Sequence, residues 1–372
     1  MTFLSICIPT YNRINFLEEL VLKFEDQIAE AGCFESVEIV ISDNNSADTT
    51  RDVILNLSTE YKNIVYNKNE SNIGGIKNII NVINLASGKY IWLFSDDDLP
   101  YEGALAKVLS TLEGVVDVGY ATMDIGTVSK ENVVREKVFL PTLYEDRLFP
   151  AKVFLSKYLY VPGFLSINIM RRDYALEFIS DEKILEEILK VGWPHLVLSA
   201  LIINKSNGAY VIASPQVMKR DGNLIFGPKQ LISAYILDPI RIVGFLFKMN
   251  VAGIKADANY RYMFDWEVVL LLFLHYLYTG EYIKINYFKE MIIAFCLAKN
   301  IKLKTRLLFC SLIFIFPKKI ASLVVYFYYC IFKDSKLYYE MKDNFIKNAK
   351  AIISYFNGEV PLHTRTYCKD EL

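Results

Sequence analysis

Short apolar runs alternate with amphipathic stretches over about the first 120 residues of the chain. The runs hold four to eight residues and are rich in β-branched and aromatic side chains, which is typical of buried strands. Between them, apolar residues recur at helical spacing. This alternation predicts an α/β fold, a mainly parallel sheet flanked by helices on both faces. The expected strands are Phe3–Pro9, Val37–Ile41, Asn63–Tyr66, Tyr90–Phe94 and Val115–Thr122, and the expected helices are Ile14–Ala31, one capped by Ser46 and ending at Leu57, Ile73–Ala86 and Glu102–Leu112.

The pattern loosens from residue 125 to about 225, and after residue 229 almost every segment is helical and aromatic. We therefore expect one domain over residues 1–228, with halves at 1–122 and 123–228, followed by a helical C-terminal region over 229–372. In the second half we expect strands at Phe164–Met170 and Tyr210–Ala213, a helix from Asp173 to about Lys190, and a helix after Pro194.

Composition excludes several classes of protein. Apolar residues make up 53% of the 372, enough for a large core, and a net charge of −1 argues against a nucleic-acid partner. The six cysteines form no C-x-x-C pair, which argues against structural zinc and indicates reduced thiols in the cytoplasm. Phe3–Pro9 is too short for a signal peptide, and Pro317-Lys318-Lys319 interrupts the long apolar run Leu307–Phe332. We therefore expect neither a signal peptide nor a transmembrane helix.

Polar side chains follow three of the predicted strands. Thr10–Arg13 comes after the first strand, Asp43–Ser46 after the second, and Ser95–Asp98 after the fourth. In an open parallel sheet, ligands bind outside the carboxyl ends of the strands. The sequence therefore predicts a ligand site at this edge of the sheet.

Three consecutive aspartates, Asp96, Asp97 and Asp98, dominate that edge. Adjacent carboxylates repel one another unless a cation or protons neutralise them, and hard oxygen ligands favour Mg²⁺ or Mn²⁺. The alternative is that Asp98 caps a helix while the other two are solvated. Asp43 at a neighbouring strand end favours the metal site. Because Pro9–Arg13 contains no glycine and no P-loop is present, a metal-held nucleotide here indicates nucleotide-sugar chemistry.

The chain resembles the family 2 glycosyltransferases, which have the GT-A fold. The matching motifs are Ile8–Arg13, Val40–Ser46, Asn72–Gly74, Ala86–Tyr90 and Asp96–Asp98, in the family's order and spacing over about the first 120 residues. Within the family, the chain is most similar to bacterial transferases that add a sugar during O-antigen or capsule assembly, abequosyltransferase-like proteins among them. The resemblance implies an inverting hexosyl or deoxyhexosyl transfer from a nucleotide sugar to a glycan acceptor.

The resemblance also implies roles for individual residues. Residues 1–122 would bind the nucleotide sugar and residues 123–228 the acceptor. Thr10 and Asp43 would contact the nucleobase and ribose, and Asp98 would bind the metal that bridges the diphosphate. Common family members place the first aspartate where Ser95 stands, so all three aspartates stay candidate ligands. The full donor set is Thr10, Tyr11, Arg13, Asp43, Asn45, Asn72, Gly74, Asn78 and Asp96, although Asn72 and Gly74 are also typical of turns, and Tyr11 and Arg13 of a helix start.

Inverting transfer needs a base that takes the proton of the acceptor hydroxyl. In the family this base is usually an aspartate at the start of a helix, but the corresponding place here holds Gly192–His195. Pro194 suits the first turn of a helix, and the helix dipole there would keep the His195 ring neutral. Glu186, Glu187 and Asp181 are the alternatives, and His195 as a polar residue lining the pocket is another. Gly163–Ser166 is either a core strand or a segment that passes near the acceptor.

Residues 299–350 contain eleven Lys or Arg and only three Asp or Glu, next to the apolar runs Leu307–Phe316 and Ile320–Phe332. Basic residues beside apolar ones suit an anionic membrane surface, where a lipid-linked acceptor would lie. A buried helical subdomain and a re-entrant hairpin are the alternatives. We thus expect a peripheral protein at the inner face of the cell membrane. A sugar-phosphate nucleotidyltransferase and a non-catalytic sugar- or membrane-binding protein are the competing functions.

Overall fold

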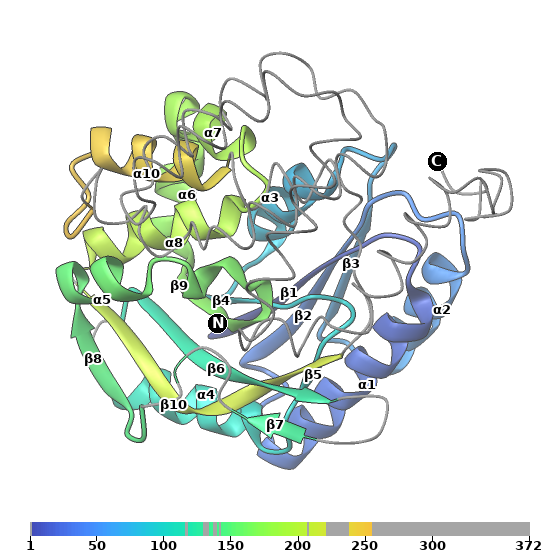
Figure 1. Ribbon diagram of the computed structural model, residues 1–372. Coiled ribbons are helices and arrows are strands. Elements are labelled where there is room, and N and C mark those ends of the chain that lie inside the picture. Colours follow the sequence, from blue (N-terminus) through green and yellow to red (C-terminus); the bar gives the residue numbers. More distant parts are fainter. Residues whose placement is uncertain are drawn as a thin grey trace, which may run out of the picture. The chain divides into compact units, whose positions relative to one another are not determined.

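The computed structural model describes residues 2–254, apart from 116–117, 129–133, 137–139, 141–142, 207 and 221–237 (Figure 1). All of them belong to one compact unit, Met1–Met263. This unit includes helix α10 (Asp238–Lys248), which packs against α8 (Pro194–Lys205). The basic segment 299–350 and most of the expected helical region lie outside the described residues. Within the described part, no helix is both long and apolar enough to cross a membrane.

A mixed sheet of ten strands forms the centre of the described part, in the order β3-β2-β1-β4-β9-β6-β10-β5. Six of the main strands point the same way, and β9 runs against both of its neighbours, β4 and β6. The main strands are β1 (Leu4–Thr10), β2 (Val37–Asp43), β3 (Ile64–Lys68), β4 (Tyr90–Leu93), β6 (Tyr120–Val128), β9 (Asn168–Arg171) and β10 (Gly208–Arg220). The short strands β5 (Leu99–Pro100), β7 (Val134–Glu136) and β8 (Arg147–Pro150) pair antiparallel with β10, β6 and β10. The expected α/β fold with a mainly parallel sheet is confirmed.

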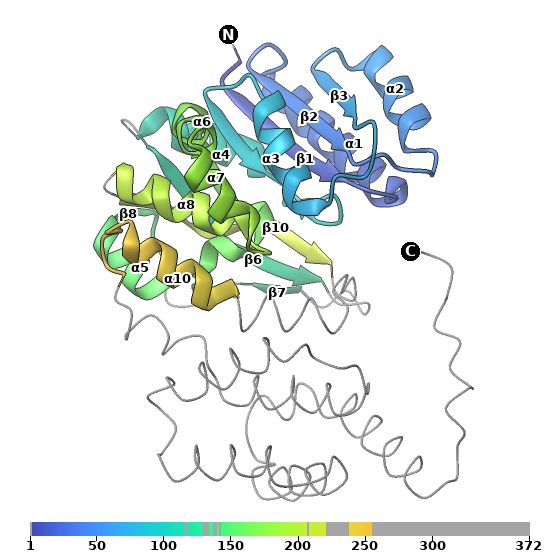
Figure 2. The same cartoon turned by 90° about the horizontal axis from the view of Figure 1, so that it is seen from above.

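The helices that connect the strands form two groups beside the sheet (Figure 2). One group consists of α1 (Ile14–Ala31), α2 (Thr50–Glu60) and α4 (Ala104–Gly114), in which α2 and α4 each pack against α1. The second group is centred on α8 (Pro194–Lys205), whose central residues are buried on all sides. Its other members are α3 (Gly75–Leu85), α5 (Ala151–Tyr158), α6 (Arg172–Ser180), α7 (Glu182–Leu189) and α10.

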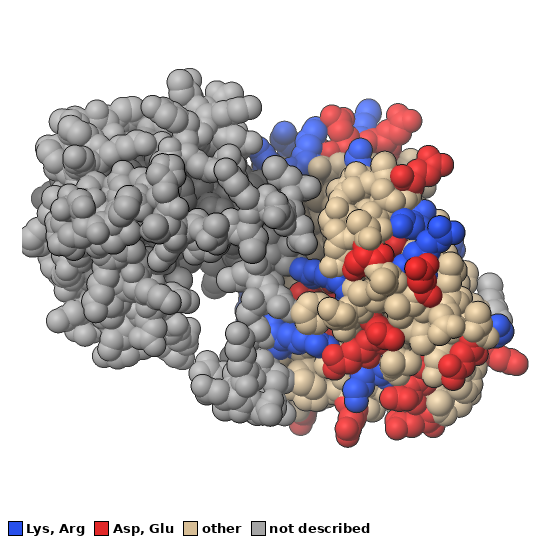
Figure 3. Space-filling view, turned by 90° about the vertical axis from the view of Figure 1, so that its right-hand side faces the viewer, with Lys and Arg blue, Asp and Glu red and all other residues tan. Residues whose placement is uncertain are grey.

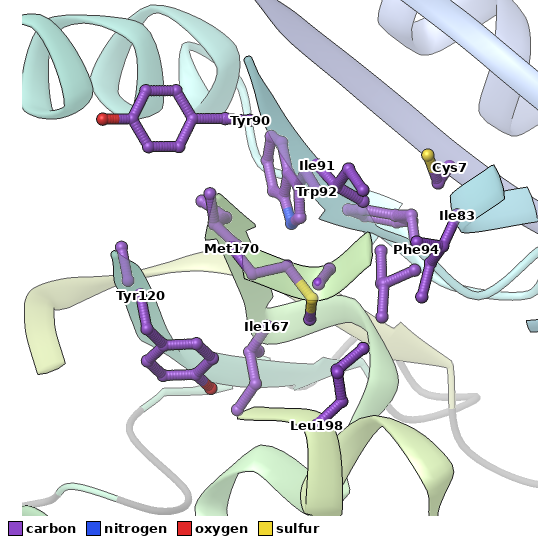
Figure 4. Packing of buried hydrophobic residues seen from close by; sticks show 14 of the residues in the cluster. Cys7, Ile83, Tyr90, Ile91, Trp92, Phe94, Tyr120, Ile167, Met170 and Leu198 are labelled. Atoms are coloured by element: carbon purple, nitrogen blue, oxygen red, sulfur yellow. The ribbon is translucent and has the colours of Figure 1, made fainter. Parts of the chain in front are cut away.

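Strand β4 lies at the centre of the core, with all four of its residues buried (Figure 4). Trp92 and Phe94 pack edge-to-face against Phe24 of α1, with ring centroids 5.6 and 5.0 Å from the Phe24 ring. Buried aromatic pairs of this kind add to the stabilisation that burial itself provides. The tight packing fixes the end of β4, which leads directly into Ser95–Asp98.

Several expected elements differ from the structure in their bounds or in how they begin. The helix expected from Asp173 to Lys190 is two helices, because Asp181 leaves the helical conformation and its Oδ1 accepts hydrogen bonds from the backbone N–H groups of Lys183 and Ile184. The strand expected at Phe164–Met170 begins only at Asn168, since two short 3₁₀ turns precede it. Ser46 does not cap α2, which begins at Thr50 with the Asp48 carboxylate accepting from the Thr50 N–H.

Glu25 of α1 is a buried carboxylate with an incomplete set of partners. Glu25 is only 2% exposed, and its Oε1 accepts a hydrogen bond from Asn63 at 3.0 Å. Oε2 has no partner among the described residues. Burial therefore raises the pKa of Glu25 from 4.5 to about 7, with the Asn63 bond opposing the shift.

We predict that Glu25→Gln stabilises the protein above pH 7. The folded state holds the Glu25 proton up to about pH 7, while the unfolded chain releases it near 4.5. Stability contributed by this group therefore falls as pH rises between these values and stays lost above them. Urea unfolding at pH 8 should show a gain of about 1–3 kcal/mol for the variant, and at pH 5 little gain.

Glu38 provides the matched control. It is also buried, but its carboxylate accepts hydrogen bonds from the Ser5 hydroxyl, the Ser87 N–H and the Ser87 hydroxyl. Glu38→Gln should therefore destabilise the protein at pH 8. A Glu25→Gln variant no more stable than wild type at pH 8 would contradict the prediction.

Candidate active site

The sheet topology brings several polar segments to one edge. The parallel strands β1, β2 and β4 end at Thr10, Asp43 and Leu93. Because β9 runs the other way, its beginning lies at the same edge, and so does Ser166 just before it. The convergence expected at the carboxyl ends of the strands is therefore present, with the addition of the segment that leads into β9.

Arg13 neutralises two of the three aspartates. Its Nη1 atom lies 2.8 Å from Asp96 Oδ1 and 3.1 Å from Asp97 Oδ2. Asp96 Oδ2 also accepts a hydrogen bond from the Thr10 hydroxyl at 2.8 Å, and Asp97 Oδ1 accepts one from Ser95 at 2.6 Å. Burial raises the pKa of Asp96 to about 6, and the Arg13 charge opposes that shift.

Asp98 is held differently. It is 4% exposed, and its Oδ2 accepts a hydrogen bond from the Ser166 hydroxyl at 2.5 Å. Burial raises the pKa of Asp98 to about 8, against the Ser166 bond and the charge of Lys219. Of the six carboxylate oxygens in the motif, five have a hydrogen-bond or ion-pair partner within the described part of the chain, and Asp98 Oδ1 has none.

These contacts leave fewer carboxylate oxygens free to bind a metal ion than the sequence predicts. No group of three His, Cys, Asp or Glu side chains in the described residues is placed to hold a metal ion, so Asp96, Asp97 and Asp98 do not form a three-carboxylate set. The reason is that the Asp96 carboxylate is already bonded to Arg13 and Thr10, and the Asp97 carboxylate to Arg13 and Ser95. Asp98 Oδ1 is left as one hard oxygen ligand. Such a site fits Mg²⁺ or Mn²⁺ that takes its other ligands from phosphate and water.

The segment before β9 is rigidly fixed. Asn168 Nδ2 donates hydrogen bonds to the carbonyls of Pro162, Phe164 and Leu165. The Trp92 indole N–H donates to the Ser166 carbonyl, and the Ser95 N–H donates to the Ser166 hydroxyl. Sequence reasoning noticed Gly163–Ser166 but did not foresee its contact with Asp98, because nothing local in the sequence indicates that β9 is reversed.

Asp43 has both carboxylate oxygens in use inside the protein. Oδ1 accepts from the Ser46 N–H at 2.8 Å and Oδ2 from the Tyr66 hydroxyl at 2.6 Å. Burial and this bond raise the pKa of Tyr66. Asp43 is completely buried, and its bond with the Ser46 N–H fixes the turn after β2. This turn is joined to the one after β1, since the Asn12 N–H donates to the Ser46 hydroxyl.

The other predicted donor residues surround these turns. Asn72 Oδ1 accepts from Asn44 Nδ2 and from the Gly74 N–H, and Gly74 has a φ of 84° at the start of α3. Asn78 is buried and bonded to Ser42 through both ends of its amide. Asn72, Tyr11 and Asn45 are exposed residues, with Tyr11 at 43%. Asn78 thus shapes the edge from inside the protein, while Asn72, Tyr11 and Asn45 are accessible to a ligand.

His195 lies in the first turn of α8 and is 5% exposed. Its Nε2 is 2.8 Å from the Gly163 carbonyl, which only accepts, so Nε2 carries the proton and Nδ1 keeps a lone pair. Nδ1 has no partner among the described residues. Burial lowers the pKa of His195 to about 4, so the ring is neutral at pH 7.

The alternative bases occupy structural positions on α7. Asp181 caps this helix, as described above. Glu186 and Glu187 both pair with Lys190, at 3.0 and 2.8 Å, on the outer side of the helix. On the face drawn in Figure 3, acidic and basic side chains are interspersed over the described part.

The described part of the chain has the GT-A fold. Two crystal structures of Staphylococcus aureus TarS residues 1–349, one of them with UDP, superpose with TM-scores of 0.54 and 0.56. They are 15% and 14% identical and cover 88% of this chain and 89% of theirs, which establishes the fold alone.

The family follows from the sequence match. Residues 5–178 match the Glycosyl transferase family 2 model, so the chain carries a family 2 glycosyltransferase domain. It is 27% identical to abequosyltransferase RfbV of Salmonella typhimurium over 74% of this chain and 82% of that protein. It is also 36% identical to a Campylobacter jejuni GalNAc(5)-diNAcBac-PP-undecaprenol beta-1,3-glucosyltransferase, over 32% of this chain and 37% of that one. The predicted family is confirmed.

Proposed function

We propose that this glycosyltransferase moves a sugar, with inversion, from a nucleotide sugar to a lipid-linked glycan during bacterial surface polysaccharide synthesis. The observation that supports the proposal is Asp98 Oδ1, the one carboxylate oxygen of Asp96–Asp98 that has no partner among the described residues, at the edge where Thr10, Asp43 and Ser166 converge. The relatives support the pathway, since one is an abequosyltransferase and the other is named for an undecaprenol-linked substrate.

In this proposal the nucleotide lies across the turns after β1 and β2. The exposed ring of Tyr11 and the side chain of Asn45 contact the base, and the turn fixed by Asp43 presents backbone groups to the base and ribose. Asn72, Gly74 and Asn78 support the wall of this site, and Thr10, Arg13 and Asp96 form its floor next to the diphosphate. A resident Mg²⁺ or Mn²⁺ would be held by Asp98 and would stabilise negative charge on the leaving diphosphate.

We assign His195 as the base. The bond to Gly163 fixes its tautomer and leaves Nδ1 as the proton acceptor for the sugar hydroxyl. A low pKa is compatible with this role, because the carboxylates that act as bases in related chemistry are equally weak bases in water. The acceptor would reach the site from the membrane surface, to which the basic segment 299–350 would bind.

We predict that Asp98→Asn abolishes the extra stabilisation that Mn²⁺ gives to the complex with a nucleoside diphosphate. The amide keeps the acceptor for Ser166 but removes the charge that binds a cation, so the fold should persist. Turnover should fall by about 10²-fold or more. In thermal unfolding, a nucleoside diphosphate should stabilise the wild type more with Mn²⁺ than without it, and the variant equally under both conditions. Asp97→Asn is the control and should still be stabilised more with Mn²⁺ than without it. If Asp98→Asn also kept this difference, Asp98 would be excluded as the metal ligand.

For His195 we predict that both Ala and Gln variants lose about 10²–10⁴-fold in turnover, the usual contribution of a general base, while donor affinity is unchanged. Gln can still donate a hydrogen bond to the Gly163 carbonyl but cannot accept a proton. Steady-state kinetics of the two variants therefore separates catalysis from positioning. Recovery of most activity in His195→Gln would show that the residue only positions the Gly163 segment.

At low salt the full-length chain should sediment with phosphatidylglycerol vesicles and not with phosphatidylcholine vesicles, and 0.5 M salt should release part of it, because salt screens surface charge. Reversing the charges of Lys318 and Lys319 to Glu should weaken this binding. Equal binding to both kinds of vesicle would argue against an anionic surface as the partner.

A further inference from the structure

Lys219, near the end of β10, is placed beside the acidic motif by strand pairing. Strand β5 begins directly after Asp98 and runs antiparallel to β10, with Val217 opposite Pro100 and Met218 opposite Leu99. The next position in this register puts Lys219 opposite Asp98. The charge of Lys219 acts on the Asp98 carboxylate, as this register requires.

Lys219 is the free cation of this part of the site. It is exposed, and it has no hydrogen-bond or ion-pair partner within the part of the chain that the structure describes. Its neighbours differ: Arg220 pairs with Glu19 at 2.7 Å and lies over the Phe16 ring, and Arg13 is held by Asp96 and Asp97. A lysine is a compact point charge on a flexible stem of about 6 Å, so it can reach a ligand next to Asp98.

We propose that Lys219 binds the diphosphate of the donor and stabilises the charge that develops on it during transfer; this rests on the proposed function. The bond between the anomeric carbon and the phosphate oxygen breaks, and its electron pair stays on that oxygen. The acceptor oxygen forms the new bond to carbon and its proton passes to His195. Lys219 donates a hydrogen bond to the phosphate and keeps its proton throughout.

The chemistry distinguishes this role from that of an ordinary surface lysine. A lysine that contacts the diphosphate contributes to binding in proportion to the phosphate charge that the ligand carries. A solvated lysine affects no ligand, whatever its number of phosphates. The comparison of nucleoside mono- and diphosphates therefore tests the proposal without any knowledge of the sugar.

The experiment compares wild type, Lys219→Gln, Lys219→Arg and Lys23→Gln in the full chain. Lys23 is an exposed lysine about 15 Å along α1 from Arg13, so its replacement removes the same charge away from the motif. UDP, GDP, CDP and dTDP, each with Mn²⁺, are titrated by calorimetry together with the matching monophosphates. Thermal unfolding without ligand verifies that all four proteins are folded.

We expect Lys219→Gln to bind the preferred diphosphate about tenfold more weakly and to lose much less affinity for the monophosphate, the size of effect typical of one charge-assisted hydrogen bond. Lys219→Arg should retain most of the affinity and Lys23→Gln all of it. Equal diphosphate binding by wild type and Lys219→Gln would overturn the role of Lys219 alone. If wild type bound none of the four diphosphates, the nucleotide-sugar proposal itself would fail, and the role of Lys219 with it.

Discussion

The hydrogen bond between Ser166 and Asp98 joins the two halves of the domain at the candidate active site. Asp98 follows β4 in the first half, and Ser166 precedes β9 in the second. Ser166 also accepts from the Ser95 N–H, so one hydroxyl satisfies a buried carboxylate and a backbone donor together. Leaving either group unpaired would cost about 1–3 kcal/mol. The bond also decides which Asp98 oxygen stays open, and so where a cation can bind.

The three aspartates can fold next to one another because polar partners satisfy five of their six carboxylate oxygens within the described residues. Arg13 supplies a positive charge to Asp96 and Asp97, and the Ser166 hydroxyl supplies a hydrogen bond to Asp98. Burial raises the pKa of Asp98 further than that of Asp96, to about 8 against about 6, because Asp96 is bonded directly to a cation, Arg13, while Asp98 is bonded to the neutral Ser166 hydroxyl. The remaining demand for positive charge is therefore concentrated on Asp98. A divalent cation bound together with the diphosphate of the donor would supply this positive charge to Asp98.

Local features of the structure could be predicted from the sequence, and long-range ones could not. Strand β1 and the acidic motif were placed well because apolar runs and the polar residues that end them are local patterns. The break at Asp181 was missed because apolar spacing continues across it, while a side chain that accepts two backbone hydrogen bonds ends one helix and starts the next. The reversal of β9 and the placement of the end of β10 beside the motif depend on tertiary contacts, which no periodicity encodes.

The same short segment also connects the proposed base to the proposed metal ligand. His195 is bonded to Gly163 and Asp98 to Ser166, three residues further along two 3₁₀ turns. Asn168 donates to three carbonyls within these turns, so the segment cannot shift at one end without the other. Inverting transfer requires the base and the leaving group to lie on opposite sides of the anomeric carbon, at a separation that tolerates little error. In the proposed reaction, a rigid segment bonded to both His195 and Asp98 would keep that separation constant, whichever sugar is transferred.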